Sequence, residues 1–175
     1  MMQRSKLWGI LAMTGGLMWM IVWVSIALRP EAEQGGYRRV DDLVVWIMIA
    51  MALVILGYIG FHWRLSHAKM LVGNLFFFVT LAGASLMALG RWMQFQGLDP
   101  QPTVGIGWIL LGLGLLSYGI YLLAKRIAPG YIGVLYLIAA VSLFALNDQD
   151  WRAWLAIPFG GGWIGIGWSK SMANK

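Results

Sequence analysis

Long apolar runs alternate with short polar segments along the whole chain. Six runs are present, at 7–28, 43–62, 70–90, 104–124, 129–146 and 153–168. About 20 helical residues cross a hydrocarbon core, so the first four runs are long enough and the last two are short. The runs lack the alternation of apolar and polar residues that a membrane β-barrel requires. The pattern therefore predicts an all-α membrane protein, a compact six-helix bundle in which residues 1–175 form one domain.

The charged residues support this division. All seven acidic residues lie in alternate gaps: Glu31, Glu33, Asp41, Asp42, Asp99, Asp148 and Asp150. The other polar segments carry basic residues alone: Arg4, Lys6, Arg64, Lys69, Lys125, Arg126, Lys170 and Lys175. The gaps with the acids hold five basic residues: Arg29, Arg38, Arg39, Arg91 and Arg152. The excess of Lys and Arg on one side predicts that both termini are cytoplasmic. We expect an integral protein of a prokaryotic inner membrane, with the lipid bilayer as its surroundings.

Composition narrows the function classes. Hydrophobic residues make up 60% of the chain and charged residues only 11%, which is far from a soluble domain. The net charge of +6 is spread over several segments, so nucleic-acid binding is not expected. The chain has no cysteine, which excludes disulfide bonds and thiolate metal sites. The gaps at 125–130 and 147–150 are short, so the last three runs should pack in sequence order.

Glycines in the fourth run form two stripes with a spacing of seven residues. One stripe consists of Gly105, Gly112 and Gly119, and the other of Gly107 and Gly114. Bare stripes let helix backbones approach closely in lipid. We therefore interpret them as a helix-packing surface, with a sliding or gating surface as the alternative.

The sixth run contains residues that disfavour a helix. Pro158 is followed by Gly160, Gly161 and Gly162. Proline removes a backbone donor, and each glycine costs about 1 kcal/mol relative to alanine in a helix interior. This segment is therefore predicted to break or kink the helix and is a candidate cavity lining. A kink held by a neighbouring helix is the structural alternative.

No catalytic constellation is visible in the sequence. The predicted spans hold no Asp, Glu, Lys or Arg, so a proton relay is not expected. No buried His, Lys or carboxylate is predicted that could activate the hydroxyl of Ser85 or Ser117 as a nucleophile. His62 and His67 fall at or beyond the end of the second run, and we interpret them as surface residues. Neither a cofactor nor a metal is expected, and no catalytic residue is assigned.

These observations predict a non-catalytic membrane protein, an accessory or assembly subunit that contacts other membrane subunits through its helices. The alternatives are a facilitator or channel for a neutral or apolar solute, with a pore lined by hydroxyl groups and backbone, and, in third place, a lipid-modifying enzyme. The alternation of glycine-rich spans with tight hairpins resembles several groups of small six-span prokaryotic membrane proteins, and no motif singles out one of them.

Overall fold

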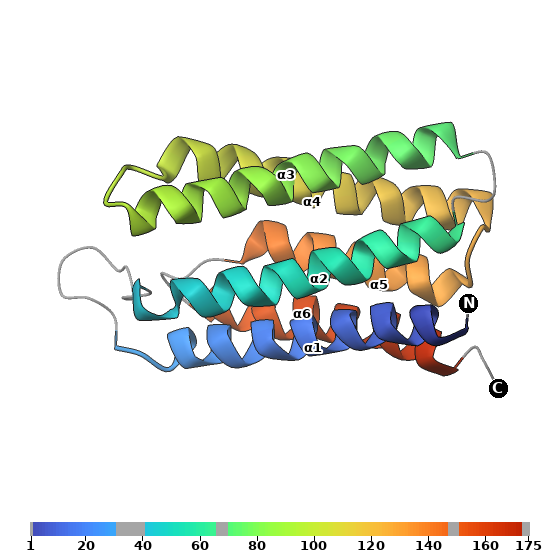
Figure 1. The fold of residues 1–175 in the computed structure, drawn as a ribbon, viewed down its shortest axis with the longest axis horizontal. Helices are drawn as coiled ribbons and strands as arrows, with labels where there is room; N and C mark the ends of the chain where they lie inside the picture. The colour runs from blue at the N-terminus through green and yellow to red at the C-terminus, as the bar shows by residue number, and fades with distance from the viewer. Residues whose placement is uncertain (1, 31–40, 66–69, 147–150, 173–175) are drawn as a thin grey trace.

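The residues that the structure describes form a bundle of six α-helices (Figure 1). The structure, a computed structural model, describes residues 2–30, 41–65, 70–146 and 151–172. The helices are α1 (Met2–Ala27), α2 (Val44–Leu65), α3 (Leu71–Phe95), α4 (Gln101–Lys125), α5 (Gly130–Ala145) and α6 (Ala156–Met172). Two short 3₁₀ helices, η1 (Asp41–Leu43) and η2 (Trp151–Leu155), precede α2 and α6. The prediction of an all-helical protein is confirmed for the described residues, which contain no strand.

The first four helices are long and apolar enough to cross a membrane, over Lys6–Ala27, Val44–Leu65, Leu71–Phe95 and Gln101–Lys125. The shorter α5 is also apolar. Exposed tryptophans mark both ends of α2, at Trp46 and Trp63. These two residues are 17 positions apart, or roughly 26 Å along a helix axis. That separation fits two aromatic belts on either side of a hydrocarbon core of about 30 Å. The protein is therefore an integral membrane protein.

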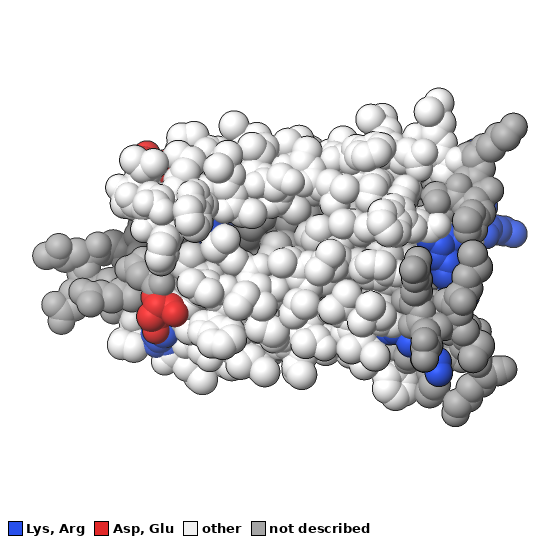
Figure 2. Space-filling model, in the orientation of Figure 1, with Lys and Arg blue, Asp and Glu red and all other residues white. Residues whose placement is uncertain are grey.

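Charges collect at the two ends of the bundle and leave the band between them uncharged (Figure 2). One end, the basic end, carries Lys6, Arg64, Lys125 and Arg126, and α1 begins and α6 finishes there (Figure 1). The other, the mixed-charge end, carries Arg29, Asp42, Arg91, Asp99 and Arg152. This distribution matches the alternation of charged gaps in the sequence.

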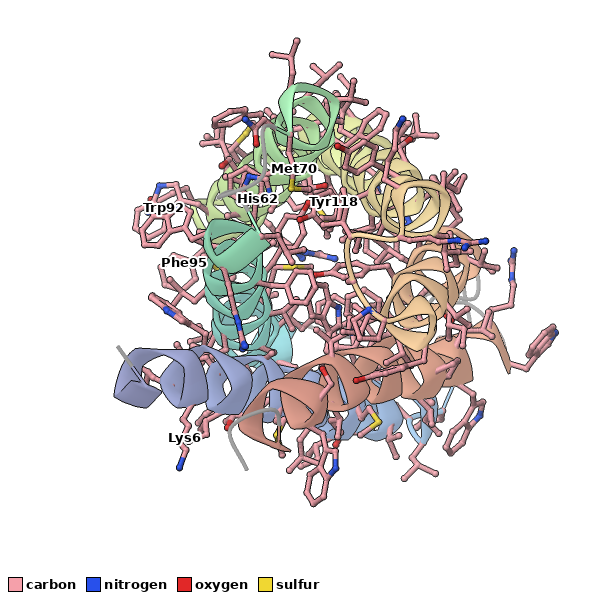
Figure 3. The ribbon with its side chains drawn as sticks, turned by 90° about the vertical axis from the view of Figure 1, so that its right-hand side faces the viewer. Lys6, His62, Met70, Trp92, Phe95 and Tyr118 are labelled. Carbon is pink, nitrogen blue, oxygen red and sulfur yellow. The ribbon has the colours of Figure 1, made fainter. Side chains whose placement is uncertain are left out.

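The helices form a ring in the order α2, α1, α6, α5, α4 and α3, visible from one end in Figure 3. Neighbours in this order pack extensively, with one exception: α2 and α3 touch in few places. The order agrees with the prediction that the last three runs pack in sequence. The ring is thus closed on five sides and has a loose seam between α2 and α3.

Aromatic side chains fill the centre of the ring. Tyr58 of α2, Tyr118 of α4, Tyr136 of α5 and Trp163 of α6 are each fully buried. The ring centroids of Tyr118 and Tyr136 lie 5.4 Å apart, and those of Tyr136 and Trp163 lie 5.5 Å apart. Their edge-to-face geometry is the favourable one for aromatic pairs. The centre is therefore a packed core and not a pore.

Glycines explain why five contacts are tight and one is loose. A Cβ on Gly107 of α4 would lie 2.7 Å from Met87 N of α3, and one on Gly16 of α1 would lie 2.5 Å from Gly160 O of α6. Both glycines of α2, Gly57 and Gly60, face α1. Those of α3 face α4 or the start of their own helix. Small residues allow helices to approach closely where lipid removes the hydrophobic drive for association. None of these glycines lies at the contact between α2 and α3, so these two helices stay further apart.

The two glycine stripes of α4 meet different neighbours. Gly107 and Gly114 lie against α3, and Gly112 and Gly119 lie against α5. Gly105 has no neighbouring atom within reach of an added Cβ. The central part of α4 therefore has close neighbours on two sides, and its first glycine faces open space.

The expected break in the sixth helix is absent. The helix α6 runs without interruption from Ala156 to Met172, through Pro158 and the three glycines. Pro158 is the third residue of α6, where a missing N–H has no intrahelical partner to lose. Gly160 packs on Gly16 of α1. A Cβ added at Gly162 would lie 3.1 Å from Leu135 O of α5. The glycines serve close packing, which offsets their low helix propensity.

Candidate functional site

The seam between α2 and α3 contains a groove of about 420 Å³. Its lining comes from these two helices alone: Ile47, Met48, Met51, Ala52, Ile55, Ile59, Leu81, Ala84, Ser85, Met87, Ala88 and Arg91. Figure 2 shows this face of the molecule hollowed between the two helices. On α2 the lining runs from Ile47 to Ile59, which is about 18 Å along the axis. The groove is long, apolar and open toward the lipid.

Arg91 is the one charged residue among the lining residues of the groove. It is half-buried, and its Nη1 donates to Gln94 Oε1 at 2.8 Å. The sequence placed Arg91 in a loop because the apolar run ends at residue 90. In the structure α3 continues to Phe95, so the helix holds Arg91 on the same face as Ala84 and Ala88. The guanidinium is therefore fixed at one end of an apolar slot.

Exposed tryptophans show the depth of Arg91 in the bilayer. Trp46 precedes the first groove residue of α2, and Trp92 follows Arg91 on α3. Both indoles are about half exposed at the mixed-charge end. Tryptophans of this kind lie at the level of lipid headgroups. Arg91 is thus placed where it can meet the anionic head of a molecule whose apolar part lies in the groove.

The opposite end of the groove is closed. Tyr58 of α2 donates to Thr80 Oγ1 of α3 at 3.3 Å, and Thr80 donates in turn to Phe76 O. One turn further, the imidazole of His62 stacks on Phe77, with ring centroids 3.8 Å apart and planes 9° apart. These contacts join α2 to α3 near the basic end. An apolar chain can enter the groove from the side but cannot pass through it to the basic end.

His62 corrects the interpretation of the histidines as surface residues. It is only 4% exposed, and its Nδ1 lies 3.0 Å from the hydroxyl of Tyr118 on α4. Asn74 of α3 is also within hydrogen-bonding reach of the ring. Figure 3 looks onto this end and shows His62 and Tyr118 within the ring of helices. The prediction was wrong because His62 is next to exposed residues in the sequence, whereas its side of α2 faces α3 and α4. His67 lies outside the described residues.

This buried polar cluster is less suited to bind a ligand than the groove. His62 and Tyr118 are hydrogen-bonded to each other, and the aromatic core surrounds them. The part of the chain that the structure describes has no group of three or more His, Cys, Asp or Glu side chains placed to hold a metal ion. The groove, by contrast, offers volume, access from the lipid and a cation at headgroup depth. We therefore take the groove as the candidate functional site.

The chain is similar to a known membrane enzyme. It is 28% identical over 144 residues to an undecaprenyl-diphosphatase of Thermus thermophilus, in an alignment that covers 72% of this chain and 55% of that protein. The chain thus spans about half the length of this relative. No family model matches the chain, and no solved structure does.

This similarity corrects the functional prediction. A non-catalytic accessory or assembly subunit, and the statement that the chain is not an enzyme, are contradicted by a relative named for a chemical reaction. The channel alternative is set aside for the same reason. The error came from the treatment of Arg91 as a loop residue, which left the predicted spans without a charged group and hid the groove beside it.

Proposed function

We propose that this protein is a membrane enzyme that acts on the diphosphate of a long-chain lipid, held in the groove between α2 and α3. The observation that carries the proposal is Arg91 at the headgroup end of an apolar groove that opens to lipid. The name of the Thermus thermophilus relative supports a prenyl diphosphate as the substrate class.

The lipid tail would lie along the groove. Its lining is almost entirely aliphatic and includes three flexible methionines: Met48, Met51 and Met87. Methionine adapts to irregular apolar shapes, which suits a branched hydrocarbon. Because the groove is open along its side, a tail longer than about 18 Å can leave the groove and continue in the bilayer. The groove thus selects an apolar chain without limiting its length.

The head would meet Arg91. A guanidinium binds phosphate oxygens through two parallel hydrogen bonds, which fixes the orientation of the phosphate as well as neutralising charge. In hydrolysis, water attacks the terminal phosphorus, the bridging P–O bond breaks, and inorganic phosphate and a lipid monophosphate are released. Such reactions depend mainly on positioning and on stabilisation of charge on the phosphoryl oxygens.

Arg91 is assigned to binding and charge neutralisation alone. Ser85 is the one hydroxyl among the lining residues. It is six residues from Arg91, or about 9 Å deeper along the helix axis. At that depth it lies beside the lipid tail and not beside the phosphate.

The proposal includes an orientation. The excess of Lys and Arg at the basic end supports a cytoplasmic location for that end, with six crossings and both termini inside. The headgroup of the bound lipid then lies at the outer face of the membrane.

The test is hydrolysis of undecaprenyl diphosphate by the purified protein in an uncharged detergent, followed as released phosphate. Arg91→Gln should lower kcat/KM by roughly tenfold or more, since charge-assisted hydrogen bonds to phosphate are lost. Arg152→Gln is the matched control, because Arg152 is at the same end but outside the groove. Ala88→Phe should raise KM by filling the groove, and Leu89→Phe, on the neighbouring exposed position, should not.

Two results would reject the proposal. The first is a folded wild-type protein that neither hydrolyses nor binds the lipid diphosphate. The second is hydrolysis that Arg91→Gln and Ala88→Phe leave unchanged, which would place the reaction outside the groove.

A further inference from the structure

A second cavity lies at the basic end, distant from the groove. It has a volume of about 180 Å³ and is formed where the end of α2, the turn between α4 and α5, and the end of α6 meet. Its lining residues are Phe61, Arg64, Leu65, Ile127, Ala128, Pro129, Tyr131, Ile132 and Ser169. Six of these are apolar, and three carry polar groups, so the cavity combines an apolar floor with a polar rim.

The charges around this cavity favour an anion. Arg64 lines it directly, and Arg126 immediately precedes the lining residue Ile127. Arg126 caps α4 in the left-handed conformation, with φ of 50°, which lets the chain turn tightly into α5. The described residues of this end include no Asp or Glu, and Figure 2 shows basic side chains there. The cationic rim is therefore not neutralised by described acidic neighbours.

Tryptophans place the rim at headgroup depth. Trp63 precedes Arg64 on α2, and Trp168 precedes Ser169 on α6. Both indoles are more than half exposed, as expected for an aromatic belt. The belt at this end is roughly 26 Å from Trp46, measured along α2. The cavity thus faces the opposite leaflet from the headgroup end of the groove.

The hydroxyl groups of the rim indicate which groups of a ligand could bind there. Ser169 Oγ donates to Ile166 O at 2.7 Å, so its proton is already used. Its oxygen can still accept a hydrogen bond, which suits a hydroxyl of the headgroup and not a phosphate oxygen. The phenol of the half-exposed Tyr131 can donate to the phosphate.

We propose that this cavity binds an anionic phospholipid of the leaflet at the basic end, with Arg64 on its phosphate and its glycerol and first acyl carbons on the apolar floor. Basic pockets between membrane helices are a recurring solution for anionic headgroups. A free phosphate would leave the apolar floor without a partner. The inference does not depend on the reaction proposed for the groove.

The probe is phosphatidylglycerol, added to the full-length protein in an uncharged detergent, with binding measured by native mass spectrometry and by the shift in Tm. Phosphatidylglycerol should bind and raise Tm, whereas phosphatidylcholine and inorganic phosphate should do neither. Arg64→Gln should weaken binding by about tenfold, as expected for a lost charge-assisted contact. Lys125→Gln, at the same end but outside the lining, should retain it.

The outcomes separate the alternatives. Equal stabilisation by inorganic phosphate would identify a free-anion site and overturn the lipid assignment. Equal loss in Lys125→Gln and Arg64→Gln would show a diffuse attraction to the basic surface and also overturn it. Ser169→Ala provides a second, conservative variant, which should weaken binding of phosphatidylglycerol without unfolding α6. Arg91→Gln should leave the binding intact, so failure of the proposed reaction would not mimic failure here.

Discussion

The contact between α1 and α6 is tight, whereas the contact between α2 and α3 is loose. Both join long apolar helices within one ring. Glycine meets glycine at Gly16 and Gly160, so the α1 and α6 backbones approach closely. The groove between α2 and α3 is lined by Met, Ile, Leu and Ala together with Ser85 and Arg91, and no glycine is among its lining residues. The first contact is sealed, and the second leaves a groove.

The difference shows where a membrane protein of this composition keeps room for a ligand. Apolar surface alone does not hold helices together in lipid, because the tails of the bilayer are equally apolar. Close association therefore depends on small residues or on polar contacts between helices. Near the basic end the seam is held by the hydrogen bond between Tyr58 and Thr80 and by the stack of His62 on Phe77. The other end is free to admit lipid.

The largest effect should come from added volume in the sealed contact. In Gly160→Ala the new methyl group would collide with Gly16 O and Met20 Cγ of α1. Overpacking of this kind costs about 1–3 kcal/mol, and the backbone oxygen cannot rotate away. The measurement is the thermal or denaturant midpoint of the purified protein in detergent.

The neighbouring glycine provides the control for that variant. An added Cβ at Gly161 meets nothing within 4 Å. Gly161→Ala should therefore stabilise α6 by about 0.5–1 kcal/mol through the lower chain entropy of alanine. Equal stability of the two variants would show that the α1 and α6 backbones are not in close contact.

How well the sequence predicted the molecule depends on the kind of signal. The helices lie at the six predicted runs because hydropathy reports burial in lipid along a whole segment. The predicted break at Pro158 was wrong, since the boundary of α6 and the packing of Gly160 on Gly16 both depend on tertiary contacts. Arg91 was missed because a hydropathy run ends at a charge even where the helix does not. A small clue was present in Ala84 and Ala88, which share one helical face with Arg91.

The next effect concerns the closed end of the seam. His62→Ala removes the ring that stacks on Phe77 and leaves the Tyr118 hydroxyl without its partner. Loss of a buried hydrogen-bond partner costs about 1–3 kcal/mol, so the unfolding midpoint should fall clearly. His62→Phe keeps an aromatic ring for the stack and should lose less.

A double-mutant cycle sharpens this prediction. His62→Phe and Tyr118→Phe each break the same hydrogen bond, so their effects on stability should be less than additive. Strict additivity would mean that the two side chains stabilise the protein independently, and the closed end would then rest on packing alone.

A smaller effect is expected in the open part of the seam. Ala52 faces the groove and is exposed. Ala52→Leu adds apolar volume where space is available, so stability should change by less than about 0.5 kcal/mol, as for substitutions away from packed contacts. The same variant should weaken capture of a lipid diphosphate, measured as a higher KM. A drop in stability comparable with that of Gly160→Ala would show that the seam is sealed after all.

The smallest effect belongs to the ion pair beyond the end of α1, which contributes least because it is exposed to solvent. Arg29 Nη1 and Nη2 donate to the two carboxylate oxygens of Asp42, each at 2.7 Å. These hydrogen bonds hold the pKa of the Asp42 carboxyl below its ordinary value of 3.8. The pair therefore stabilises the folded protein at pH values above 3.8, and this contribution is lost as the pH falls through the lowered pKa.

Salt should screen this ion pair, because Asp42 is 65% exposed. The check is the midpoint of unfolding between about pH 2 and 6, roughly two units on either side of an unperturbed carboxyl pKa of about 4, at low and high salt. Asp42→Asn should lose part of the acid-dependent decline and part of the salt effect, while an unchanged pH profile would show that this pair does not stabilise the mixed-charge end.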